Sequence, residues 1–377
     1  MQSAPRIIGD GCYPAGSRQQ RVKEVNVTTK ENKEHRRPMN VYVRRGSKAE
    51  KAFRKRIGSP IPKAIVPGIA PSPDHDLRYQ GGKTIQNLRF MNFYVGGDAW
   101  DPSDIANVDK ALAAAMSDRN LNNVMVQYFP GQITTNFDGS QNLPGSAPQV
   151  ISQGDVEQIV TTFYNGGKLT AHDLTSTVFN VMLPPGTVLN TDTTLTGGAQ
   201  HVSAAVKKAA VKRKGIVVQD DADSLNGLGG YHGSVHASGT DTVYYAVGVY
   251  SQTEADGTVN GIPVFNQPWK NVVATFYHEL NEARTDADVE DAIRAGNNPN
   301  ANSFLGWVSD QGEECGDYPV SEAGGNLTEV FQEVELTDKS GTVPVQFMYS
   351  DAAHGPEGPI AQANPPVNSL QRSVGSS

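Results

Sequence analysis

The segment 269–285 reads WKNVVATFYHELNEART, and the interpretation of the rest of the chain depends on it. Its apolar residues recur at spacings of three and four, which predicts an amphipathic helix with one apolar stripe formed by Val272, Phe276, Leu280 and Ala283. His278 and Glu282 lie four residues apart and therefore share the opposite side of this helix.

The pattern His278-Glu279-x-x-Glu282 suits a divalent cation held between an imidazole nitrogen and a carboxylate oxygen. It resembles the H-E-x-x-H helix of zinc peptidases, in which the first Glu is the general base, so Glu279 is the expected base here. Glu282 stands where that motif has its second His. An added carboxylate lowers the Lewis acidity of zinc and leaves calcium and manganese open as alternatives. The competing interpretation is a solvated face of a surface helix.

A third metal ligand is expected from the acidic loop at 306–317, where Glu314 or Asp317 would supply it. Asp286 directly follows the helix. It is expected either to orient His278 as a hydrogen-bond acceptor or simply to close the helix end.

A glycine-rich segment at 229–236, predicted to be a turn, offers two more histidines. We expect His232 either to bind the metal or to donate a hydrogen bond to a developing oxyanion. His236 is the weaker candidate for the same roles. The alternative for both is a solvated imidazole.

Five short motifs occur in an order that resembles one protein family: Arg78-Tyr79-Gln80-Gly81-Gly82, Val181-Met182-Leu183-Pro184-Pro185-Gly186-Thr187, Gly230-Tyr231-His232-Gly233-Ser234, His278-Glu279-Leu280-Asn281-Glu282 with Thr285-Asp286, and Glu314-Cys315-Gly316-Asp317. Over about residues 77–350 the chain resembles the phosphate-induced, Exordium-type proteins of plants and their bacterial and fungal relatives. The resemblance implies a zincin-like fold and an extracellular location. Residues 1–20 nevertheless lack the apolar core of a secretory signal.

The chain departs from the family pattern at Cys315, which lies inside the acidic motif, and at Ala287, where the family has proline. These departures put the family disulfide in doubt more than the metal site. Cys12 and Cys315 are expected either to pair or to remain free thiols.

The predicted elements alternate between strands and helices, which is typical of an α/β fold with a mixed sheet and packed helices. Strands are expected at 87–95, 123–129, 177–183 and 242–250, and helices begin at capping residues Asp101 and Ser152. The strand at 242–250 directly precedes the metal helix. It is expected either to form the edge of a cleft that pairs with an extended peptide or to be an interior strand.

Charge divides the chain into a basic arm and an acidic body. Residues 1–80 hold 17 Lys/Arg against 7 Asp/Glu, whereas residues 81–377 hold 15 against 33. We therefore assign 1–76 to a basic, proline-rich arm or prosegment, 77–350 to the metal-binding domain and 351–377 to a flexible tail. An insertion at 188–228 is expected to carry a short basic helix. No run of 18 apolar residues occurs, so no membrane span is expected.

These observations favour a metal-dependent hydrolase, most simply a zinc peptidase acting on a peptide or protein substrate. The alternative is a non-catalytic extracellular or cell-surface binding protein that uses the same site for a structural calcium. A third interpretation is an assembly protein whose basic arm binds an anionic polymer. No nucleic-acid recognition motif accompanies the basic charge, which argues against nucleic acid.

Overall fold

The computed structural model describes residues 69–193, 223–296, 298–324 and 326–367. The predictions for the arm at 1–68, for Cys12 and for the basic helix of the insertion lie outside these residues. Residues 69–76, which the charge pattern places in the arm, pack on the body: Tyr349 donates a hydrogen bond to the Ser72 carbonyl, and Ser72 N–H donates one to the His354 carbonyl.

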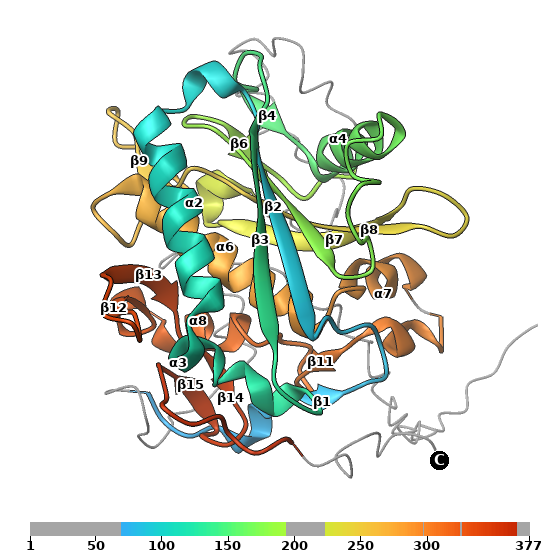
Figure 1. The fold of residues 1–377 in the computed structure, drawn as a ribbon, viewed down its shortest axis with the longest axis vertical. Helices are drawn as coiled ribbons and strands as arrows, with labels where there is room; N and C mark the ends of the chain where they lie inside the picture. Colours follow the sequence, from blue (N-terminus) through green and yellow to red (C-terminus); the bar gives the residue numbers. More distant parts are fainter. Residues whose placement is uncertain (1–68, 194–222, 297, 325, 368–377) are drawn as a thin grey trace, which may run out of the picture. The chain divides into compact units, whose positions relative to one another are not determined.

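The body is built on a five-stranded sheet in the order β3-β2-β5-β8-β7 (Figure 1). Neighbouring strands from β3 to β8 run parallel, and β7 pairs with β8 antiparallel. The strands are β2 (Asn87–Tyr94), β3 (Thr134–Asn142), β5 (Thr177–Met182), β7 (Gly230–His236) and β8 (Thr242–Gly248). This mixed sheet with packed helices confirms the predicted α/β fold.

Helices cover both faces of the sheet (Figure 1). Helices α2 (Pro102–Ser117) and α6 (Pro268–Thr285) lie on one face and α4 (Gln153–Asn165) lies on the other. Side chains alternate between these layers along each strand, as the two-residue period of a strand requires. On β8, Ala246 belongs to the α2–α6 core, whereas Tyr245 and Val247 belong to the α4 core.

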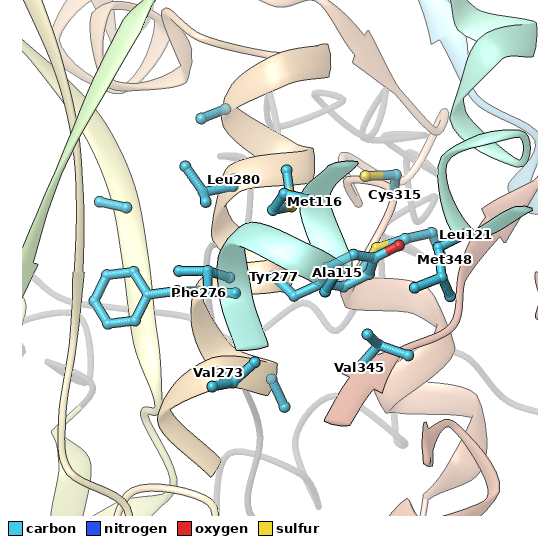
Figure 2. Packing of buried hydrophobic residues seen from close by; sticks show 14 of the residues in the cluster. Ala115, Met116, Leu121, Val273, Phe276, Tyr277, Leu280, Cys315, Val345 and Met348 are labelled. Atoms are coloured by element: carbon cyan, nitrogen blue, oxygen red, sulfur yellow. The ribbon is translucent and has the colours of Figure 1, made fainter. Parts of the chain in front are cut away.

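Helix α6 is enclosed on all sides because a second group of elements covers the face turned away from the sheet. The hairpin of β12 (Phe331–Glu335) and β13 (Thr342–Gln346) packs there, with β13 against both α6 and α2. Figure 2 shows Met116 of α2 and Val345 of β13 near the apolar side of α6, where Tyr277 and Leu280 lie. The site helix is therefore part of the interior of the body.

Shorter elements complete the described residues: helices α3 (Arg119–Asn122), α7 (Val289–Ala295) and α8 (Asp317–Ala323), and the strand pairs β1 (Arg78–Tyr79) with β11 (Trp307–Val308), β4 (Val150–Ile151) with β6 (Val188–Leu189), β9 (Gln252–Thr253) with β10 (Val259–Asn260), and β14 (Met348–Ser350) with β15 (Gly355–Glu357). Single turns of 3-10 helix occur at Pro73–His75, Gly97–Ala99, Met125–Tyr128, Ser224–Asn226, Ala301–Phe304 and Leu327–Glu329. None of the described helices combines the length and apolar character that a membrane crossing needs.

The predicted helix starts are confirmed. Asp101 accepts a hydrogen bond from Ser103 N–H at the start of α2, and Pro102 occupies the first helical position. At the start of α4, Ser152 and Asp155 form a reciprocal capping box, which satisfies two N–H groups that would otherwise lack partners.

The predicted strand at 123–129 is wrong. Its residues form the turn of 3-10 helix at Met125–Tyr128, in which the Gln127 side chain donates to the Val124 carbonyl and to Ser350 Oγ. The strand of the sheet comes later, at β3. Its sequence, TTNFDGSQN, is polar because β3 is the outer strand of the sheet and is mostly half-buried or exposed.

One further expectation near the site is wrong, and one alternative left open there is decided. Residues 229–236 are not a turn, because 230–236 form β7 at the other edge of the sheet. The strand that precedes the site helix, β8, lies between β5 and β7, so it is an interior strand rather than a cleft edge. At the C-terminal end, residues 351–367 are not a tail: β15 pairs with β14, and Val367 N–H donates to the Gln127 carbonyl.

Candidate metal centre

The polar side of α6 is as deeply buried as its apolar side. His278 and Glu279 are 1 % exposed and Glu282 is fully buried. A solvated helix face would leave these side chains in water, so that interpretation is wrong. Burying ionisable groups is costly unless they are paired or bind a metal, and the surroundings of these three side chains therefore decide what the site does.

His278 is held by a chain of two hydrogen bonds. Its Nδ1 lies 2.8 Å from Gln346 Oε1, and Gln346 Nε2 donates to the Gly316 carbonyl at 2.6 Å. The second bond fixes which end of the amide faces the ring. An amide oxygen only accepts, so Nδ1 carries the proton and the lone pair of a neutral His278 is on Nε2. That atom lies 3.0 Å from Glu282 Oε2.

His232, on β7, is oriented in the same way from the other side of the site. Its Nε2 lies 3.0 Å from the Asp286 carbonyl oxygen, which can only accept. Nε2 therefore carries the proton, and Nδ1 of the neutral ring has the lone pair. Nδ1 lies 3.5 Å from Glu279 Oε2 and 3.8 Å from Glu282 Oε2. Both imidazoles thus turn an unprotonated nitrogen toward one oxygen of Glu282.

Glu282 is held in place by its other oxygen, because Gly316 N–H donates to Oε1 at 3.0 Å. Three more carboxylates surround this point. Glu279 Oε1 lies 4.0 Å and Asp317 Oδ1 lies 3.9 Å from His278 Nε2, and Glu314 Oε1 lies 3.5 Å from His232 Nε2. The elements that meet here are α6, β7 and the loop that leads into α8.

Several of these oxygens have no hydrogen-bond partner within the described part of the chain. They are Glu279 Oε2 and both oxygens of Glu314, whereas Glu282 Oε2 pairs with His278 Nε2. Buried carboxylates are normally hydrogen-bonded, paired with a base or bound to a metal, and an orphaned buried charge costs several kcal/mol. Two sets of side chains place possible ligand atoms within 4.8 Å of one another: His278, Glu279 and Glu282, and His232, Glu282 and Glu314. The buried histidines and carboxylates therefore fit a metal ion.

The acidity of the cluster reflects its burial. Burial raises the pKa of Glu279, Glu314 and Asp317 well above the usual carboxyl range, and neighbouring carboxylates, Glu282 foremost, raise that of Glu314 and Asp317 further. Burial lowers the pKa of His278, but the charges of Glu282 and Glu279 outweigh it and the net shift is upward. A cation that binds here would displace protons, so its affinity rises with pH.

Two glycines make room for the cluster. A Cβ at Gly316 would lie 2.5 Å from His278 Cε1 and 2.9 Å from Glu282 Oε1. A Cβ at Gly230, on β7, would lie 2.9 Å from Thr275 Cγ2 and 3.2 Å from Glu279 Oε1. Both approaches are tighter than ordinary van der Waals contacts. The backbones of the acidic loop and of β7 can therefore reach the site helix only at glycine.

The structure brings together His278, Glu279, Glu282, Glu314, Asp317 and His232, all expected from the sequence. Of the two roles expected for Asp286, the structure has it close the end of α6. Its carbonyl orients His232 instead of His278, and its side chain accepts from Gly306 N–H at 2.7 Å.

Three other residues near or away from the site require comment. His236 lies apart from the cluster, half-exposed beside Asp291 at 2.9 Å. Cys315 is buried, contacts Thr285 Oγ1 and forms no disulfide within the described residues, and its expected alternative partner Cys12 lies outside them. Gln346, which orients His278, was not among the expected residues, because nothing in the sequence connects a glutamine on β13 with the site helix.

No protein-family model matches the chain, and neither a curated protein nor a solved structure matches it. Function is therefore inferred from the geometry of the site.

Proposed function

We propose that the chain is a metal-dependent hydrolase, with zinc held by His278 Nε2, His232 Nδ1 and Glu282 Oε2. The observation that carries the proposal is that two imidazoles, each oriented by its own acceptor, turn their lone pairs toward one buried carboxylate oxygen. In a tetrahedral zinc site, ligand atoms lie about 3.3 Å apart. The separations of Glu282 Oε2 from the two nitrogens, 3.0 and 3.8 Å, bracket that value. Each set of ligand atoms within 4.8 Å of one another contains only one of the two histidines, so a bound zinc would have to draw the two rings together.

The donor set supports zinc and leaves a fourth position for chemistry. Two histidines and one glutamate form the ligand set of several zinc peptidases. In this proposal His232 is the third ligand, in place of Glu314 or Asp317. The Asp286 carbonyl and Gln346 would fix the two rings and so favour metal affinity.

Zinc in such a site lowers the pKa of a bound water and polarises a substrate carbonyl. Glu279 lies beside the proposed ligands and turns an unpartnered oxygen toward the same space. Its raised pKa suits a group that takes a proton and then delivers it to the leaving amine. We assign Glu279 as the general base and infer a peptide or protein substrate.

The resemblance to Exordium-type proteins supports an extracellular location and a zincin-like fold as parts of the same proposal. The basic arm, if it acts as a prosegment or binds an anionic polymer, would regulate or localise the enzyme. Arm deletion followed by binding to an anionic polysaccharide column tests this point separately from catalysis.

Glu279→Gln tests the catalytic proposal, because it keeps the shape of the side chain and removes the base. Peptide hydrolysis should fall by 10²-fold or more while metal content is unchanged. Glu335→Gln, at an exposed position at the end of strand β12, is the control and should behave as wild type. Unchanged hydrolysis in Glu279→Gln, with the metal retained, contradicts the assignment.

A second candidate is a structural metal site in a non-catalytic binding protein, and the burial of the cluster favours it. His232, Glu282 and Glu314 are fully buried, and Asp317 is only 6 % exposed. Structural sites are closed, whereas a catalytic site must admit substrate. Catalysis therefore requires the segments around the site to separate. Stoichiometric metal in a protein that cleaves no member of a broad peptide library would support this second candidate.

A further inference from the structure

We propose that the site holds two divalent cations, the second bound by Glu314 with Glu282 shared between them. This inference rests on the proposed metal site and adds a ligand role for the acidic loop. The two sets of ligand atoms in the cluster, His278 with Glu279 and Glu282, and His232 with Glu282 and Glu314, have Glu282 in common. Because His232 Nδ1 is assigned to the zinc, Glu314 and the shared Glu282 remain as protein ligands of the second cation.

Charge is the first argument. Five buried carboxylates meet at the site: Glu279, Glu282, Asp286, Glu314 and Asp317. When ionised they carry five negative charges, and one divalent cation offsets two, so three remain. Among the described residues, the ion pairs of these side chains involve histidines only, and neither lysine nor arginine joins them. A second divalent cation reduces the excess to one.

Glu314 supplies the second argument. It is fully buried, and neither of its oxygens has a hydrogen-bond partner within the described residues. It lies on the Nε2 side of the His232 ring, 3.5 Å from that atom, whereas the proposed zinc lies on the Nδ1 side. The first cation therefore leaves Glu314 without a partner, although burial of an orphaned carboxylate is costly.

Glu282 is close enough to the ligands of both positions to be shared. Ligand atoms of His232, Glu282 and Glu314 all lie within 4.8 Å of one another. In two-metal sites the ions lie about 3.5–4 Å apart, a distance that a shared carboxylate spans. Glu282 is the residue placed to bridge, because Oε2 lies near both imidazoles while Oε1 is held by Gly316 N–H.

The two positions differ in chemistry. The first is rich in nitrogen and suits zinc. The second is rich in oxygen, because Glu314 and Glu282 are its ligands and the carboxylates of Asp286 and Asp317 lie close enough to raise the pKa of Glu314. Oxygen ligands favour a hard cation such as calcium or manganese. A mixed pair, one zinc with one hard cation, is the expected composition.

Elemental mass spectrometry tests the inference on the full chain, purified without chelators and equilibrated with zinc and calcium before gel filtration. Wild type should retain two divalent cations per chain, and Glu314→Gln should retain one. Glu335→Gln should retain two. Circular dichroism on each variant shows whether it folds.

The number of bound cations distinguishes failure of the second cation site from failure of the zinc site. One cation per wild-type chain overturns the second site, and Glu314 is then a protonated buried acid, while the zinc site stands. No bound cation overturns both. The wild-type ratio decides the question even if Glu314→Gln does not fold.

Discussion

Replacing Gly316 by alanine should weaken metal binding without unfolding the protein. Gly316 precedes α8, and its backbone carries two contacts of the site: its N–H donates to Glu282 Oε1, and its carbonyl accepts from Gln346 Nε2. A methyl group at this position would point at the His278 ring and at Glu282. The substitution therefore acts on a proposed ligand through contact alone.

The size of the effect follows from the geometry. The new Cβ would lie 2.5 Å from His278 Cε1 and closer still to Nδ1. Ordinary contact begins at 3.4 Å, so ring and loop must separate by at least 3.4 − 2.5 = 0.9 Å. Metal–ligand distances vary by only about 0.2 Å in functional sites. Disturbing the groups that orient a ligand typically costs about 10–100-fold in affinity, or about 1.4–2.7 kcal/mol.

Isothermal titration calorimetry with zinc on the metal-free protein measures the change. Gly239→Ala is the matched control, because a Cβ there meets nothing within 4 Å. We expect Gly316→Ala to bind zinc at least tenfold more weakly and Gly239→Ala to bind as wild type. Equal affinity in a folded Gly316→Ala protein would refute the assignment of His278 as a ligand in this geometry.

Three further predictions concern orientation, titration and packing. Gln346→Leu removes the acceptor of His278 Nδ1 and should weaken zinc binding by about 10–100-fold in the same titration. Burial raises the pKa of Asp351 to about 7, so between about pH 4 and 7 the folded protein keeps a proton that the unfolded chain loses, and the unfolding free energy should fall as the pH rises through this window. In urea titrations, Asp351→Asn should reduce this fall by up to about 4 kcal/mol. Parallel curves of unfolding free energy against pH for wild type and Asp351→Asn would disprove the shift. Leu280→Ala should lower the unfolding free energy by about 3–5 kcal/mol, because the Leu280 side chain of α6 is fully buried in the core. A loss below about 1 kcal/mol would contradict that packing.

The site helix was predictable because its apolar stripe has a helical period and its ligand spacing places His278 and Glu282 on one side. The burial of that side was not. It depends on β13 and on the loop before α8. The acidic residues of that loop were expected as ligands, but no local pattern indicates that β13 packs against the helix. For the same reason Gln346 could be recognised only from the folded structure.

Errors in the sheet have two physical causes. The outer strand β3 is polar, so it lacks the alternation of apolar and polar residues that marks a half-buried strand. The apolar residues at 123–129 were therefore predicted to be the strand in its place. In β7 the glycines indicate a turn locally, yet Gly230 is needed where the strand passes close to Thr275 and Glu279. Proximity to another element, rather than backbone flexibility, explains that glycine.

The most direct test of the account is the metal content of chelator-free protein, measured by elemental mass spectrometry on wild type, His278→Ala and His236→Ala. His236 is the control because its half-exposed side chain lies apart from the cluster. We predict bound zinc in wild type and His236→Ala, and loss of that zinc in folded His278→Ala. Wild-type protein without a bound divalent cation, or His278→Ala with an unchanged zinc content, would contradict the claim that this cluster is a metal centre.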